Sequence, residues 1–496
     1  MIGAVGYKVI TLNRNQKELY PTMNTFSKKS LHVALAGLST LGLAGAAEAV
    51  MVNPNGLGQV LIYPYYTVRN GFNVGGVSAA PFNTLLSIVN TTASTKAIKV
   101  RFREGKASKE VLDFNVFLSP KDMWVAAVTP SAAGGAQIET PDRSCTVPTF
   151  PALPVEFRTT DFAGDAIGGG VERTTEGYFE VFEMATYLST DQVATGSKHT
   201  SAGVPKDCSV VNDTTAAIAP QQPNGGLSGT ATLINVLTGD AFTTDATALV
   251  QFNVNGGGAY YNTGSALPDF TQANPSTGTG VSSSGMIVQG LFALPELAAT
   301  AALQHPNVIN EFVLDKSTAS GTDWVLTFPT KHNLVDETSA LLPFQNALGS
   351  KGSCDDITIA LYNREEGPPA SNPGTDFSPL PPGQAGPALC WESNILTFNN
   401  SNVLGSANKY NINTGEANGW MNVGFRAGAI NVAVSSSGFD PSTGTLTAPS
   451  TTFSGLPTIG FAVQTYVNGT LTDSTGKLIQ SSYGGNFGHR YFGPQP

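Results

Sequence analysis

The sequence predicts a mainly β protein made of antiparallel β-sandwich domains, Ig-like or jelly-roll-like in form, with long loops rich in Gly, Pro, Ser and Thr. Three observations predict it. Apolar and polar residues alternate over many short runs, as in strands with one face on a core. Only 12% of the 496 residues are charged, and the chain holds 54 Gly and 31 Pro. Long helices need Glu and Lys on their surfaces, so this composition favours strands and turns.

The N-terminal part predicts export. Lys28 and Lys29 precede a short apolar run that ends in the small residues of "AEA". A basic segment, an apolar segment and small residues before a cleavage point define a secretory signal peptide. We therefore expect a signal peptide over residues 23–49, cleaved near Ala49, and we interpret residues 1–22 as an upstream start artefact. An N-terminal membrane anchor is the alternative interpretation of the apolar run.

The first strands follow one another closely. In "KAIKVRFRE" the apolar Ile98, Val100 and Phe102 alternate with basic residues, which predicts one dry and one wet face. The expected wet face carries Lys99, Arg101 and Arg103. "EVLDFNVFL" (110–118) repeats the pattern, and "SPKD" then turns the chain into "MWVAAV". These runs predict consecutive antiparallel strands.

Similar alternation continues along the chain. It predicts further strands at 177–184, 231–237, 246–254, 285–294, 323–330, 356–363, 419–425, 429–436, 458–467 and 471–482. Only "PELAATAALQ" (295–304) is typical of a helix, because proline occupies its first turn, alanine dominates it and another proline follows its end.

Long Gly-, Pro-, Ser- and Thr-rich segments separate the strands and suggest two domains. The segment "APQQPNGGLSG" (219–229) is polar and follows the first pair of cysteines. We therefore expect a first β-sandwich domain over residues 50–218 and a second β-rich domain over residues 226–496.

The charge balance excludes some partners. The chain has 26 basic and 36 acidic residues, a net charge of −10, and loss of the N-terminal segment makes it more acidic. An acidic surface repels phosphate backbones, so we expect no nucleic-acid partner.

Four cysteines agree with export. Cys145, Cys208, Cys354 and Cys390 form no CxxC pair, so their spacing does not fit zinc or iron–sulfur ligation. In an oxidising compartment the simplest scheme joins Cys145 to Cys208 and Cys354 to Cys390, although four cysteines allow three pairings.

Motifs of the common enzyme classes are absent from the sequence. It contains no GxSxG, no HExxH, no Walker A and no GxGxxG before a helix. His332 and His489 have polar or turn-rich neighbours, which favour a loop or surface position. We therefore expect no catalytic residue and no cofactor.

Acidic loops leave two alternatives open. Glu365 with Glu366, or Asp355 with Asp356, are carboxylate pairs of the kind that a glycosidase uses, although solvated loop charge is the simpler interpretation. The oxygen-rich segments "DDITIA", "NGTLTDSTG" and "FDPSTGT" supply hard ligands, so calcium is a possible ion, although no EF-hand loop occurs.

Aromatic residues gather near the start of the exported chain. "LIYPYYTVR" contains the candidate ligand or partner contacts Tyr63, Tyr65, Tyr66 and Arg69. Exposed tyrosines stack on sugars or anchor protein partners, whereas tyrosines in a strand also fit the edge of a core. All four tryptophans stand in strand-like contexts and are interpreted as core residues.

Several phrases, "GLGQVLIYPYYTV", "LSIVNTTASTKAIKVRFREG" and "LTFPTKH", together with the signal peptide, resemble uncharacterised secreted or cell-surface β-rich proteins of Gram-negative bacteria. Those proteins have no assigned activity, so the resemblance implies a location and no functional residue.

Three hypotheses follow. The first is a secreted or cell-surface structural or adhesive protein without catalysis, as in a surface layer, which contacts a surface polymer, a glycan, a protein or itself. The second is a carbohydrate-binding protein or glycoside-active enzyme that uses the tyrosines and a carboxylate pair. The third is an outer-membrane β-barrel, in which the wet strand faces line the lumen.

Overall fold

The computed structural model describes residues 48–491 apart from 72–80, 152, 284, 368–386, 427, 435–437, 441–444, 448–449, 473 and 477. The segment 1–22 and all but the last two residues of the expected signal peptide 23–49 lie outside the described residues.

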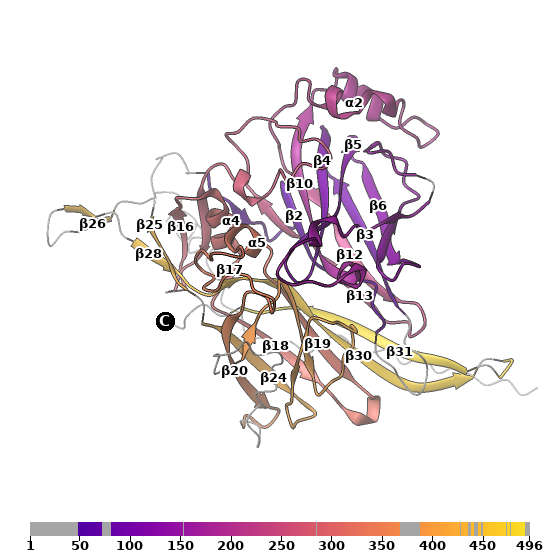
Figure 1. Ribbon diagram of the computed structural model, residues 1–496, viewed down its shortest axis with the longest axis vertical. Helices are drawn as coiled ribbons and strands as arrows, with labels where there is room; N and C mark the ends of the chain where they lie inside the picture. Colours follow the sequence, from indigo (N-terminus) through magenta and orange to yellow (C-terminus); the bar gives the residue numbers. More distant parts are fainter. Residues whose placement is uncertain are drawn as a thin grey trace, which may run out of the picture. The chain divides into compact units, whose positions relative to one another are not determined.

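Two seven-stranded antiparallel sheets, here called the N-terminal sheets, contain the first fourteen strands (Figure 1). The first sheet has the order β1 (Met51–Val52), β14 (Thr247–Val250), β2 (Val60–Thr67), β10 (Glu176–Tyr187), β4 (Thr95–Glu104), β5 (Glu110–Leu118) and β8 (Thr146–Val147). The second has the order β13 (Ala241–Asp245), β12 (Thr230–Asn235), β3 (Phe82–Asn90), β6 (Met123–Pro130), β7 (Ala136–Glu139) and β9 (Val155–Glu156), with β11 (Leu227–Ser228) paired to β3.

The N-terminal sheets share one buried hydrophobic cluster. Val100 of β4 and Val181 of β10 enter it from the first sheet, and Ile88 of β3 and Trp124 of β6 enter it from the second. The predicted inward face of "KAIKVRFRE" is therefore confirmed, because Ile98, Val100 and Phe102 all belong to this cluster.

The predicted wet face of β4 is wrong. Lys99, Arg101 and Arg103 are all buried. Lys99 Nζ donates to the carbonyl of Asn262 (2.8 Å), and Arg101 Nη1 donates to the carbonyl of Pro268 (2.9 Å). The loop that contains these two carbonyls covers the basic face, and its polar backbone replaces the water that the alternation predicts.

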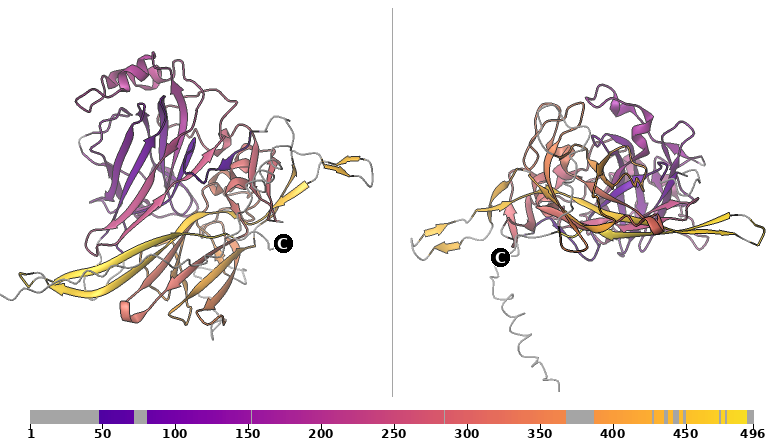
Figure 2. Two further views of the ribbon diagram at one scale, coloured as in Figure 1. Left: turned by 180° about the vertical axis from the view of Figure 1, so that it is seen from behind. Right: turned by 90° about the horizontal axis from the view of Figure 1, so that it is seen from below.

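Two further sheets, here called the C-terminal sheets, also share a core. The third sheet has the order β23 (Lys409–Ile412), β22 (Ser393–Phe398), β19 (Gly321–Thr327), β30 (Ile459–Thr472) and β31 (Leu478–Gly488), with β22 and β23 parallel. The fourth has the order β18 (Asn307–Val313), β24 (Asn418–Phe425), β20 (Asp355–Asn363) and β21 (Ala388–Leu389). Trp324 of the third sheet and Met421 of the fourth lie in one buried cluster. Figure 2 shows β30 and β31 as a long hairpin.

The remaining elements are short. A four-stranded sheet contains β15 (Thr277–Val281), β16 (Ile287–Leu291), β25 (Ile430–Val434) and β28 (Ser450–Phe453), and two pairs join β17 (Gln304–His305) to β29 (Leu456–Pro457) and β26 (Gly438–Asp440) to β27 (Thr445–Thr447). The α-helices are α2 (Gln192–Ser197), α3 (Asp213–Ala216), α4 (Pro295–Leu303) and α5 (Lys331–Leu334). The 3-10 helices are η1 (Thr160–Phe162), η2 (Val171–Thr175), η3 (Cys208–Val210), η4 (Phe270–Gln272) and η5 (Lys316–Thr318). Helix α4 confirms the one helix that the sequence predicts.

The protein is thus mainly β, with antiparallel sheets, as expected. Strands β12 and β14 follow the boundary expected at 219–229, yet they pair with β3 and β2. That boundary therefore falls inside the paired N-terminal sheets and not between two domains. Each sheet of the described residues has two edge strands, so they do not form the closed sheet of the third hypothesis.

Candidate ligand-binding site

The tyrosines of β2 belong to the core. Tyr63, Tyr65 and Tyr66 are fully buried, and the Tyr65 hydroxyl donates to Glu176 Oε2 (2.6 Å). β2 lies between β14 and β10, and both of its faces are covered. The tyrosines are therefore not exposed contacts, which corrects the predicted site. Arg69, at the end of the strand, is partly exposed and donates to the carbonyl of Gly405 (2.8 Å).

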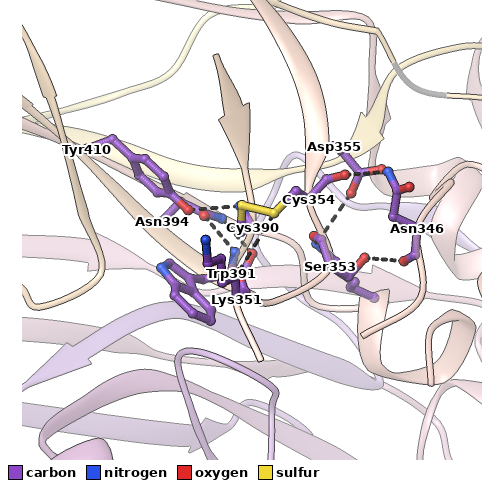
Figure 3. Close-up of a disulfide and its surroundings, with 10 residues drawn as sticks. Asn346, Lys351, Ser353, Cys354, Asp355, Cys390, Trp391, Asn394 and Tyr410 are labelled. Atoms are coloured by element: carbon purple, nitrogen blue, oxygen red, sulfur yellow. Dashed lines mark hydrogen bonds and ion pairs between the residues drawn. A yellow bond between two sulfur atoms is a disulfide. The ribbon is translucent and has the colours of Figure 1, made fainter. Parts of the chain in front are cut away.

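Both expected disulfides are present. Cys145 pairs with Cys208 and Cys354 pairs with Cys390, with Cα–Cα distances of 5.3 and 3.7 Å. The second disulfide joins Cys354, just before β20, to Cys390, just after β21 (Figure 3). Cys390 precedes Glu392 by two residues, so the disulfide fixes the chain close to this acid.

The segment from Cys390 to Glu392 is held at each residue. The N–H of Cys390 donates to Tyr410 Oη (2.9 Å), and the N–H of Trp391 donates to Asn394 Oδ1 (3.0 Å). The carbonyl of Glu392 accepts from the N–H of Phe328 (2.8 Å). These contacts fix the backbone on both sides of Glu392.

A second fixed turn faces Glu392. β4 and β5 are joined by residues 105–109, and Glu104 ties this turn down by accepting from the N–H groups of Lys106 (2.9 Å) and Ala107 (2.8 Å). Arg173 Nη2 donates to the same carboxylate (2.8 Å). The turn therefore places Ser108 rigidly against the pocket described next.

The Glu392 pocket is a cavity of about 660 Å³, lined by residues of both the N-terminal and the C-terminal sheet regions. This volume lies within the range of small-molecule sites, which often occur between packed units of a protein. Its polar lining residues are Arg103, Ser108, Lys109, Glu110, Asp161, Asp269, His332, Asn333, Asp336, Glu337, Thr338 and Glu392.

Glu392 is the most deeply placed acid of the pocket, with 3% of its surface exposed. Among the described residues, no hydrogen-bond partner reaches its Oε2 atom. Burial raises the pKa of this carboxyl to about 8, although the nearby charge of Lys331 opposes the rise. Without a ligand, Glu392 therefore keeps its proton at neutral pH.

A chain of side chains connects the pocket to β10. Arg103 Nε donates to Glu180 Oε2 (2.9 Å), and Arg103 Nη1 donates to the carbonyl of Ser108 (2.8 Å). The Tyr178 hydroxyl lies 2.8 Å from Ser108 Oγ and 3.2 Å from His332 Nδ1. Burial and the positive charges of Arg103 and Arg101 hold the pKa of His332 well below its ordinary value, so the imidazole is neutral.

Three polar atoms of the lining lack a partner within the described chain. They are Glu392 Oε2, His332 Nε2 and Asn333 Oδ1. Buried polar atoms are nearly always hydrogen-bonded, and an unpartnered one costs about 1–3 kcal/mol. Three such atoms in one cavity indicate a site that a ligand or water completes.

The sequence-predicted acid pairs lie elsewhere. Glu365 is exposed and pairs with Arg364 (2.8 Å), and Asp355 is buried against Lys331 (3.3 Å). Sequence reasoning missed Glu392 and assigned His332 to a loop or surface. The one available signal is the phrase "CWESNILTF", where an acid stands between a cysteine–tryptophan pair and an apolar strand.

Of the three oxygen-rich segments proposed for calcium, "FDPSTGT" (439–445) lies largely outside the described residues. In "NGTLTDSTG" (468–476) the one acid, Asp473, lies outside them too, and in "DDITIA" Asp355 is engaged by Lys331. In the part of the chain that the structure describes, no group of three or more His, Cys, Asp or Glu is placed to hold a metal ion. Over the same residues, no helix has the length and apolar character needed to cross a membrane.

Comparison of the chain with protein-family models, with curated proteins and with solved structures gives no match in any of the three. The pocket therefore has to be interpreted from its own chemistry.

Proposed function

We propose that the protein is a secreted or cell-surface β-sandwich protein that binds a small polar ligand in the Glu392 pocket without catalysis. The observation that carries the proposal is the buried, unpartnered Oε2 of Glu392 in a cavity of about 660 Å³. A buried carboxyl oxygen without a partner destabilises a fold, so its presence in a cavity favours a functional role.

The two disulfides support the extracytoplasmic part of the proposal, because disulfides persist in oxidising compartments. The paired N-terminal sheets and the paired C-terminal sheets, each around its own core, support a rigid sandwich scaffold.

The engagement of the other acids favours binding over glycoside hydrolysis. Glu110 Oε2 lies 2.7 Å from Arg101 Nε. Asp269 accepts from the N–H of Thr271 (2.9 Å) and from Asn333 Nδ2 (3.2 Å). Hydrolysis of a glycosidic bond requires two carboxyl groups that both act on the substrate, and of the acids that line the pocket Glu110 and Asp269 are already bound to protein groups.

A second candidate function is adhesion or self-association through the second sheet. An apolar groove of about 700 Å³ lies on its exposed face, lined by the side chains of Leu85, Met123 and Leu153 among others. Exposed apolar patches of this kind often mark protein contacts. Analytical ultracentrifugation of the full chain and of Leu85→Ser tests this candidate: a monomer at every concentration contradicts self-association.

Two experiments test the main proposal. Cell fractionation with N-terminal sequencing of the mature protein locates it, and recovery from the cytosol alone contradicts the compartment. A thermal-shift screen of sugars, polyols, amines, carboxylates and calcium, run on the full chain and on Glu392→Gln, tests binding. The expected result is stabilisation by one ligand class that Glu392→Gln loses, and stabilisation by no class contradicts the proposal.

A further inference from the structure

We propose that the ligand of the Glu392 pocket is a small organic amine in its ammonium form, paired with the ionised carboxylate of Glu392. This inference rests on the proposed binding function and names the class of ligand.

The charge of the lining favours a cation. Six carboxyl groups face the cavity, whereas Arg103 and Lys109 are its two cationic side chains. Arg103 is already engaged by Glu180 (2.9 Å). An anionic ligand would meet an excess of negative charge, whereas a cation would meet attraction from several sides.

The unpartnered atoms favour an N–H donor. Asn333 Oδ1 is an amide oxygen and can only accept a hydrogen bond, and the same holds for Glu392 Oε2 once that carboxyl is ionised. The Tyr178 hydroxyl has one proton, and Ser108 Oγ and the carbonyl of Pro329 are both within its reach. When Tyr178 donates its proton to either of these, its contact with His332 Nδ1 is a hydrogen bond only if Nδ1 carries the imidazole proton and donates it to the Tyr178 oxygen. In this tautomer Nε2 of His332 is an acceptor. A primary ammonium group has three N–H donors and no acceptor, which matches three acceptors.

A bare divalent ion fits this set less well. Calcium takes six to eight oxygen ligands, whereas the unpartnered atoms here are one carboxylate oxygen, one amide oxygen and one imidazole nitrogen. A neutral polyol fits less well too, because it gains nothing from the excess of carboxylates.

The proposal includes a proton transfer with a simple balance. In the empty pocket Glu392 is protonated at neutral pH, because burial outweighs the charges around it. The charged groups near Glu392 are Arg103 and Glu104 of β4 and Lys331 of α5. Ser108 of the turn and Tyr178 of β10 are neutral neighbours. The ammonium group arrives with its proton, the Glu392 carboxyl ionises, and one proton leaves for the solvent. Binding is therefore expected to tighten as pH rises toward 8.

Isothermal titration calorimetry of the full chain tests the inference. The probes are 1,4-diaminobutane, the uncharged 1,4-butanediol, the anion succinate and calcium chloride. We expect the diamine to bind at least about tenfold more tightly than the other three. We also expect release of about one proton per amine at pH 7, measured from the dependence of the heat on buffer ionisation.

Two variants and one matched control complete the test. Glu392→Gln is expected to weaken diamine binding by at least about tenfold, and Asn333→Ala by about threefold. Glu365→Gln removes an exposed acid that does not line the pocket and is expected to change binding less than threefold. Unchanged far-UV circular dichroism shows that a variant is folded.

The outcomes separate the two proposals. Preferential binding of the diol, of succinate or of calcium overturns the amine inference and leaves the binding function in place. Equal binding of the diamine by the wild-type chain and folded Glu392→Gln also overturns it. Absence of binding for every class in the wider screen overturns both.

Discussion

The N-terminal and C-terminal sheets bury charge in different ways. In the N-terminal sheets, buried Glu183 pairs with Lys96, and buried Glu180 pairs with Arg103 (2.9 Å). In the C-terminal sheets, Asp355 has Lys331, but Asp323 is held by neutral groups, with the N–H of Leu404 as a donor (2.9 Å).

This difference affects the pKa values of the buried acids in the two regions. In a buried pair each partner favours the ionised form of the other and so opposes the effect of burial, although burial still raises the pKa of both Glu180 and Glu183. Burial without a bonded cation raises the pKa of Asp323 to about 6 and that of Glu392 to about 8. The C-terminal region therefore carries two buried acids, Asp323 and Glu392, that have no bonded cation to oppose the effect of burial on their pKa.

The largest expected effect is the pH dependence that Glu392 imposes. Below pH 4.5 the carboxyl is protonated in both states. As pH rises from 4.5 to about 8 the unfolded chain ionises while the folded chain keeps its proton, so stability falls. The loss amounts to roughly 5 kcal/mol over this window. Urea unfolding at pH 5 and pH 8 is expected to show a smaller loss for Glu392→Gln.

The matched control is Glu365→Gln, which removes an exposed acid. It is expected to keep the wild-type dependence on pH. The same dependence in Glu392→Gln would contradict the assignment and would remove the proposed contrast between the two regions.

The next effect tests the paired charges of the N-terminal region. Arg173→Met leaves the buried carboxylates of Glu104 and Asp165 without their cation, from which they accept at 2.8 and 2.6 Å. Loss of one partner of a buried pair costs roughly 3–5 kcal/mol. The exposed pair of Arg364 and Glu365 is the comparison, and Arg364→Met is expected to cost under about 1 kcal/mol. If Arg173→Met and Arg364→Met lose the same free energy of unfolding in urea, the buried pairs stabilise the fold no more than the exposed pair does.

Part of this contrast is readable in the sequence and part is not. The alternation in "KAIKVRFRE" correctly assigns the inward residues of β4, and the simplest of the three pairings of the four cysteines is the one observed. Helix α4 follows from its proline and alanines. Each of these depends on neighbours close in the chain, or on a choice among few pairings.

The missed features depend on distant segments. Arg101 is buried by a loop 164 to 167 residues further along the chain, whose backbone carbonyls take the place of solvent. Glu392 and His332 meet the β4–β5 turn only through the packing of the C-terminal region on the N-terminal sheets. Periodicity describes which face of a strand is polar, but it does not tell what covers that face.

A smaller effect is expected from removal of the disulfides, and the two disulfides are expected to differ in their effect on amine binding. The pairs Cys145–Cys208 and Cys354–Cys390 close 63 and 36 residues. Replacing either pair with alanines is expected to cost about 2–4 kcal/mol in urea unfolding. Only loss of Cys354–Cys390 is expected to weaken amine binding, because that disulfide fixes the chain at Glu392. Equal weakening by both would show a general loosening of the fold.

The smallest expected effect concerns the outer face of the fourth sheet. The sequence places all four tryptophans in the core, but Trp420 is 37% exposed and stacks on Tyr362 with ring centroids 4.3 Å apart. The outer face of the first sheet is covered by a loop, whereas this face of β24 is open. Trp420→Ala is therefore expected to cost about 1 kcal/mol, mainly the lost stacking.

Trp124, fully buried between the N-terminal sheets, is the control, and Trp124→Ala is expected to cost about 3–5 kcal/mol. A loss for Trp420→Ala that approaches this value, and that grows with protein concentration, would mean that a second copy covers the ring. The open face of the fourth sheet would then be an assembly surface, since only a stability that depends on concentration distinguishes burial by a partner from burial within the chain.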